Sequence, residues 1–66
     1  MSNSDYHHKL VGLLKENGFE VSRHHGGHTI FKKPDGQGPT VVVPHSIADR
    51  NLAKRISRQA GVEPRL

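Results

Sequence analysis

The sequence predicts an α+β domain with the element order helix, strand, strand, strand, helix. Apolar residues recur at helical spacing near both ends of the chain, and three short strand-like segments separated by glycine-rich turns lie between them. Consecutive strands with short connections form an antiparallel sheet. Two amphipathic helices bury their apolar stripes most economically on one face of that sheet, so we expect one domain spanning residues 1–66.

The first helix is predicted by apolar residues at helical spacing, namely Tyr6, Leu10, Leu13 and Leu14. Ser4 or Asp5 is the expected N-cap, because a short oxygen-bearing side chain satisfies the free N–H groups of a first turn. Gly18 is the expected stop signal at the other end.

The first strand is predicted over residues 19–23, where alternation places Phe19 and Val21 toward the core. The chain then turns at Gly26-Gly27, and the second strand covers residues 28–32.

The third strand is predicted over the β-branched residues 40–43, after the turn-forming segment 34–38. Neither glycine-rich turn has the strand-to-helix context of a nucleotide-binding loop.

The second helix is predicted over residues 46–60. Ser46 or Asp49 is the expected N-cap, and Gly61 with Pro64 ends the helix. The residues on or near its apolar face are Ile47, Leu52, Ala53, Ile56 and Ala60.

The composition describes a small, basic, cysteine-free chain. Folding buries only roughly 60% of the surface of so short a chain, so the core is small. Without cysteine there is no disulfide framework and no thiolate zinc site. No segment resembles a membrane span or a signal peptide, which leads us to expect a cytoplasmic protein without membrane contact. The net charge of +4 and the pI of about 10.0 favour an anionic partner such as nucleic acid.

One histidine lies at a turn-to-strand junction beside several cations. His28 opens the second strand directly after Gly26-Gly27, with Arg23 before it and Lys32 and Lys33 after it. An imidazole titrates near neutral pH and exchanges protons, and the cations suit a polyanionic substrate. His28 is therefore the predicted catalytic residue, and Arg23, Lys32 and Lys33 are predicted to contact RNA phosphates. The alternative is a turn histidine that only binds the backbone.

Metal-free cleavage of RNA needs a base for the ribose 2′-hydroxyl, an acid for the leaving 5′-oxygen and positive charge at the phosphorane. His28 fits either proton-transfer role. The second partner is left open, with His25 across the turn as a possible auxiliary residue.

The remaining histidines have plainer interpretations. His24 and His25 suit a solvated hairpin tip, His7 and His8 the surface of a first helical turn, and His45 the loop before the second helix. A metal site at positions 24, 25 and 28 is disfavoured, because adjacent strand residues point to opposite faces and no carboxylate or cysteine completes a ligand set. We expect no cofactor.

A basic stripe lies on the second helix at positions spaced by four, namely Arg50, Lys54 and Arg58. A solvated helix face is the plain interpretation. Like charges at this spacing cost a few tenths of a kcal/mol per pair, however, and an RNA phosphate or an acidic protein would relieve that repulsion. We therefore predict that the stripe binds RNA.

The ordered set of motifs resembles the HicA toxins of toxin–antitoxin modules over nearly the whole chain. The motifs are Gly18-Phe19, Gly26-Gly27-His28, Ile30-Phe31, Pro34-Asp35-Gly36, Val41-Val42-Val43-Pro44 and Arg58-Gln59-Ala60-Gly61. The resemblance implies a fold like that of double-stranded-RNA-binding domains, an mRNA-cleaving endoribonuclease activity at the histidine matching His28, and neutralisation by a HicB antitoxin. This chain has Gly27 where serine is commoner in the family, and Thr29 where many members carry a second histidine.

Two other classes of function stay open. The chain is alternatively a non-catalytic RNA-binding module that recognises shape and phosphates, or an interaction protein whose basic face docks an acidic partner. Binding of RNA without cleavage would support the first, and a tight protein complex without RNA affinity the second.

Overall fold

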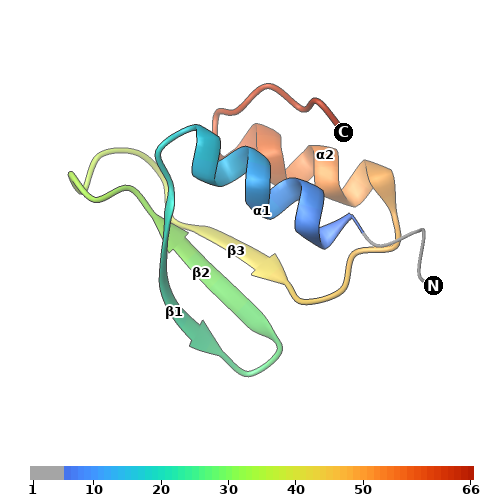
Figure 1. Cartoon of the computed structure of the whole chain (residues 1–66), viewed down its shortest axis with the longest axis horizontal. Coiled ribbons are helices and arrows are strands. Elements are labelled where there is room, and N and C mark those ends of the chain that lie inside the picture. The colour runs from blue at the N-terminus through green and yellow to red at the C-terminus, as the bar shows by residue number, and fades with distance from the viewer. Residues whose placement is uncertain (1–5) are drawn as a thin grey trace.

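A computed structural model describes residues 6–66 and confirms the order helix, strand, strand, strand, helix (Figure 1). The elements are α1 (His7–Glu16), β1 (Glu20–His25), β2 (His28–Lys32), β3 (Val41–Pro44) and α2 (Arg50–Gln59). The expected caps Ser4 and Asp5 lie outside the described residues. Tyr6 occupies the N-cap position of α1 without a side-chain cap bond.

The three strands form an antiparallel sheet in the order β1-β2-β3. Residues 28–32 form β2 as predicted, whereas β3 covers one residue later than predicted, from Val41 to Pro44. In the register between β2 and β3, His28 lies opposite Pro44 and Phe31 lies opposite Val41.

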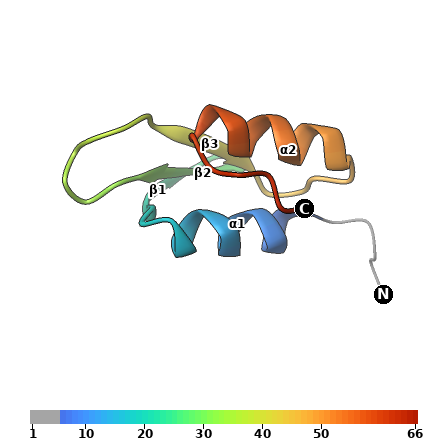
Figure 2. The same ribbon diagram turned by 90° about the horizontal axis from the view of Figure 1, so that it is seen from above.

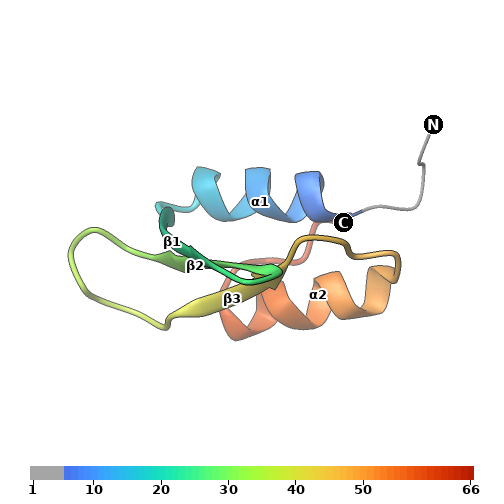
Figure 3. The same cartoon turned by 90° about the horizontal axis from the view of Figure 1, so that it is seen from below.

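The two faces of the sheet differ in what covers them. Thr29, Phe31, Val41 and Val43 are buried, and strand alternation places these four side chains on one face. Both helices pack on this side, which we call the inner face. Figure 2 looks onto the helices with the strands behind them, and Figure 3 looks from the opposite side, with the strands in front. No described helix covers the opposite side, the outer face.

The core lies between the inner face and the two helices. α1 and α2 run side by side in the same direction, and the C-terminal tail returns between them (Figure 2). The buried hydrophobic residues are Leu10, Leu14, Phe19, Phe31, Val41, Val43, Ile47, Ala53, Ile56, Ala60 and Val62.

The second helix is shorter than predicted. It begins at Arg50 rather than at residue 46, because Asp49 is the N-cap and its carboxylate accepts a hydrogen bond from the backbone N–H of Asn51 at 2.9 Å. Ile47 is fully buried, but it packs from the loop before the helix. Leu52 is 36% exposed and does not belong to the core, so its predicted place on the apolar face is wrong.

The first strand also departs from the prediction. It runs from Glu20 to His25 rather than over residues 19–23, and Phe19 is buried just before it begins. Val21 lies opposite the buried Phe31 and so faces the inner side as predicted, but it is 43% exposed and is not part of the core. The register between β1 and β2 shifts between Val21 and Arg23, which makes Ser22 the extra residue of a β-bulge.

Over the described part of the chain, neither helix combines the length and the apolar character that crossing a membrane requires.

Candidate active site and nucleic-acid interface

A two-residue turn joins β1 to β2 and sets the neighbours of His28. Gly26 has a φ of 59°, in the left-handed region that glycine adopts without steric cost, and Gly27 completes the turn. The strand residues flanking this turn are His25 and His28, and they lie opposite each other in the register. The turn therefore presents two imidazoles side by side at one end of the sheet.

His28 belongs to the outer face. The next residue of β2, Thr29, is buried on the inner face, and neighbouring strand residues point to opposite sides. His28 itself is exposed. It therefore lies on the face of the sheet that no described helix covers, where an extended substrate has access to it.

The bulge at Ser22 decides which residues of β1 join His28. Beyond the bulge, Arg23 lies opposite Ile30 and His25 lies opposite His28. Opposed residues share a face of the sheet, so both point to the outer side. In an unbroken strand, Arg23 would share a face with Val21, which lies opposite the buried Phe31.

The two lysines after His28, both predicted to contact RNA, lie in different surroundings. Lys32 lies opposite Glu20 on the outer face and is exposed. Lys33 follows the strand, is half-buried, and holds its Nζ atom 5.2 Å from the centroid of the Phe19 ring. Lys32 thus shares the surface of His28, whereas Lys33 packs against a core residue.

Apolar side chains lie in the middle of the outer face. Ile30 is half-buried, and Val42, its partner on β3, is 50% exposed. With Arg23 opposite Ile30 on the other side, the surface offers a cation beside an apolar patch. Single-stranded nucleic acid fits such a surface, because its phosphates are anionic and its bases have apolar faces.

The basic stripe of α2 does not share this face. Arg50 stacks with its guanidinium carbon 5.7 Å from the centroid of the Tyr6 ring, Lys54 is half-buried and Arg58 is exposed. All three belong to the helix layer, which packs on the inner face. The structure therefore divides the predicted cations between two layers.

Sequence reasoning missed a row of histidines on the inner side. The Nδ1 atom of His24 lies 3.1 Å from the Thr29 hydroxyl oxygen. Its ring centroid is 6.0 Å from that of His45, which is 6.1 Å from that of His7. His7 in turn contacts His8, at 5.6 Å between centroids.

This row adds to two interpretations. His24 is exposed, as expected for a solvated position, but its ring also lies against Thr29 and His45. His7 lies in the first turn of α1 as expected, but it is half-buried and donates a hydrogen bond from Nδ1 to the Pro44 carbonyl at 2.8 Å. His45 lies in the loop before α2 as predicted, and its backbone N–H bonds the Gly27 carbonyl at 3.0 Å. Sequence periodicity cannot relate residues that lie so far apart in the chain. The alternation of β1 after the bulge does explain why His24 points to the inner face.

Metal binding gains no support from the geometry. Among residues 6–66, no group of three or more His, Cys, Asp or Glu side chains is arranged to hold a metal ion. The disfavoured set of residues 24, 25 and 28 is split, because His24 points to the inner face and the other two to the outer face.

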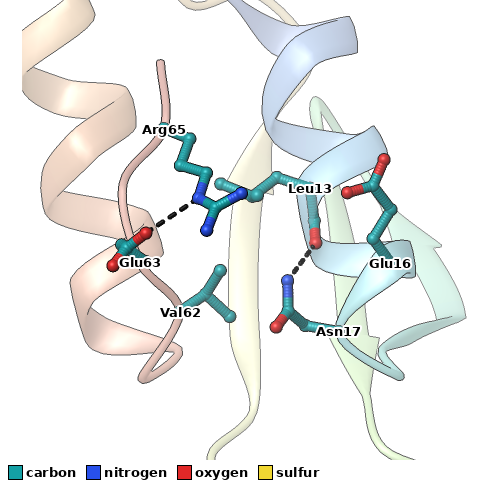
Figure 4. A pocket seen from close by; sticks show the side chains of 6 residues that line it. All are labelled: Leu13, Glu16, Asn17, Val62, Glu63 and Arg65. Carbon is teal, nitrogen blue, oxygen red and sulfur yellow. Dashed lines mark hydrogen bonds and ion pairs between the residues drawn. The ribbon is translucent and has the colours of Figure 1, made fainter.

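A separate hollow lies between the end of α1 and the C-terminal tail, away from the sheet (Figure 4). Arg65 and Glu63 form an ion pair at 2.8 Å on its rim. The hydrogen bond to Glu63, with the negative charge of that carboxylate, raises the pKa of the Arg65 guanidinium, which is charged throughout the physiological range in any case. None of the predicted site residues lines this hollow.

A family model described as HicA toxin of bacterial toxin–antitoxin matches residues 8–62, which is most of the chain. No curated protein and no solved structure matches.

Proposed function

This chain belongs to the HicA toxin family of bacterial toxin–antitoxin systems, and on that premise we propose that it is an endoribonuclease that cleaves mRNA without a metal ion. His28 acts as the general acid or base. The observation that carries the proposal is the exposure of His28 on the outer face, on the same surface as Arg23 and Lys32.

The chemistry follows from what these side chains can do. Imidazole takes or gives a proton at neutral pH, so transfer of the 2′-hydroxyl proton needs no bound metal. Arg23, the cation nearer to His28 on the outer face, attracts the reacting phosphate and offsets the negative charge that grows on its oxygens. Lys32 stands about 13 Å from His28 along the strand and contacts a neighbouring phosphate. The helix-layer cations Arg50, Lys54 and Arg58, together with Lys33, contact further phosphates of a chain that passes around the sheet.

Induced expression tests the proposal. We compare wild type with His28→Ala and with the control His8→Ala, whose histidine is exposed in the first turn of α1. Loss of an acid–base group typically lowers the rate by 10²- to 10⁴-fold, enough to restore growth and intact mRNA for His28→Ala. The control remains toxic. Equal toxicity of all three proteins would exclude a catalytic role for His28, and RNA binding without cleavage by wild type would favour the non-catalytic module.

A toxin requires neutralisation, and the basic charge of this chain indicates how. We propose that a HicB-like antitoxin with an acidic surface covers His28 and the cations of the outer face, and that both proteins act in the cytoplasm. In such a complex, His28 is protected from modification by diethyl pyrocarbonate while His8 still reacts. Modification of His28 at the rate of the free toxin would show that the antitoxin binds elsewhere.

A further inference from the structure

We infer that His25 is the second proton-transfer group of the reaction and forms a complementary acid–base pair with His28. The inference rests on the proposed cleavage of RNA at His28, and it assigns a role to a residue on the neighbouring strand.

The pairing across the hairpin is the first support. His25 and His28 are opposed in the register, and opposed residues of an antiparallel pair hold their Cβ atoms about 4.5–5.5 Å apart on one face. Both side chains are exposed. The turn between them has only two residues, and so short a loop fixes the register. Two imidazoles are thus held within reach of the two oxygens of one phosphodiester linkage.

The bulge at Ser22 is the second support. Val21 lies opposite the inner-face residue Phe31, and a regular strand would send Val21, Arg23 and His25 to the same side. The extra residue reverses that parity, so Arg23 and His25 emerge on the outer face. Bulges occur frequently beside active sites, where they re-aim a side chain.

The other proton donors near His28 are unsuitable. His24 and His45 face the inner side, where their rings contact each other. Lys32 shares the outer face, but it stands four residues from His28 along an extended strand, which is about 13 Å. An arginine guanidinium is not deprotonated in proteins, so Arg23 transfers no proton.

The reaction balances with the pair alone. One neutral imidazole removes the 2′-hydroxyl proton as the 2′-oxygen forms its bond to phosphorus. The bond from phosphorus to the 5′-oxygen breaks, and the other imidazole, in its protonated form, gives its proton to that oxygen. The products are a 2′,3′-cyclic phosphate and a 5′-hydroxyl. The two imidazoles end with exchanged protonation states, which proton exchange with water restores.

The test uses purified full-length protein and two RNA substrates of the same sequence, one natural and one with a bridging 5′-sulfur at the cleaved linkage. A thiolate leaves without help from an acid. We expect His25→Gln and His28→Gln each to lower kcat/KM on natural RNA by about 10²- to 10⁴-fold. We further expect only one of the two variants, the one lacking the acid, to recover on the 5′-thio substrate. His24→Gln is the matched control, because its histidine is adjacent to His25 and points to the other face.

A pH profile adds a readout that a merely structural role would not change. Wild-type kcat/KM should fall at low pH, where the base is protonated, and at high pH, where the acid has lost its proton. Each single variant should lose one of these limbs. If His25→Gln retains wild-type kcat/KM within about threefold, or loses activity equally on both substrates with both limbs intact, His25 is not the partner. If wild type itself cleaves neither substrate, the proposed nuclease function fails instead.

Discussion

The Nδ1 atom of His7 donates a hydrogen bond to the carbonyl oxygen of Pro44 at 2.8 Å, across 37 positions of sequence. This bond ties the first turn of α1 to the last residue of β3. Pro44 is also the register partner of His28. The helix layer is therefore anchored at the strand position beside the proposed catalytic histidine.

The first prediction concerns this anchor. His7→Ala should lower the free energy of unfolding by about 1 kcal/mol, because the partly buried carbonyl of Pro44 loses a hydrogen-bond donor. His8→Ala is the control, since an exposed side chain is expected to change stability by no more than about 0.5 kcal/mol. Urea unfolding of the two variants measures the difference. Equal midpoints would mean that the bond adds nothing to stability.

The second prediction concerns the hairpin turn. A Cβ atom on Gly26 would meet nothing within 4 Å, so the cost of Gly26→Ala is conformational: its φ is 59°. Forcing alanine into the left-handed region costs about 1–2 kcal/mol. Gly27 has equally open space and is not in that region, so Gly27→Ala should be nearly neutral. Thermal unfolding of the pair checks this, and an equal loss in both would contradict the turn geometry.

The third prediction concerns cofactors and products. Because imidazoles perform the proton transfers in the proposed reaction, cleavage should persist in excess EDTA and leave a 2′,3′-cyclic phosphate with a 5′-hydroxyl. Mass spectrometry of the fragments identifies both ends. Loss of cleavage on chelation, or fragments with a 5′-phosphate, would mean that a different chemistry operates.

The fourth prediction separates the two layers of cations. In the His28→Ala background, changing Arg50, Lys54 and Arg58 to Gln should reduce the log-log salt slope of RNA binding by about two to three, at ~0.7–0.9 per phosphate contact. Changing Arg23 and Lys32 should reduce it by about 1.4–1.8 on the same scale. Filter binding at several salt concentrations gives both slopes. If the triple variant keeps the wild-type salt slope, the stripe on α2 is only a solvated face, and RNA contacts the sheet alone.

Local patterns were sufficient to predict most of the fold. The apolar spacing of Leu10 and Leu14 identified the buried side of α1, and Gly26-Gly27 identified the hairpin. These signals are local, since helical spacing and turn chemistry involve residues only a few positions apart. The second helix was predicted too long because Ile47 continues its apolar pattern, although Asp49 caps the helix after it.

The arrangement around His28 was less accessible to sequence reasoning. The bulge at Ser22 leaves no compositional mark, yet it reverses the facing of every later residue of β1. Strict alternation from Val21 would therefore send Arg23 and His25 to the inner face and His24 to the outer face. The row of rings that connects His24 to His7 through His45 depends on long-range packing, which no single segment encodes.

The bulge also bears on how the molecule meets its own copies. β1 is an edge strand, and all six of its residues are exposed. A regular exposed edge presents a continuous row of free N–H and C=O groups on which another chain can build a further strand. Ser22 interrupts that row and increases the local twist, and Arg23 adds a charge directly beside the interruption. The irregularity that turns His25 outward therefore also works against aggregation along the open edge of the sheet.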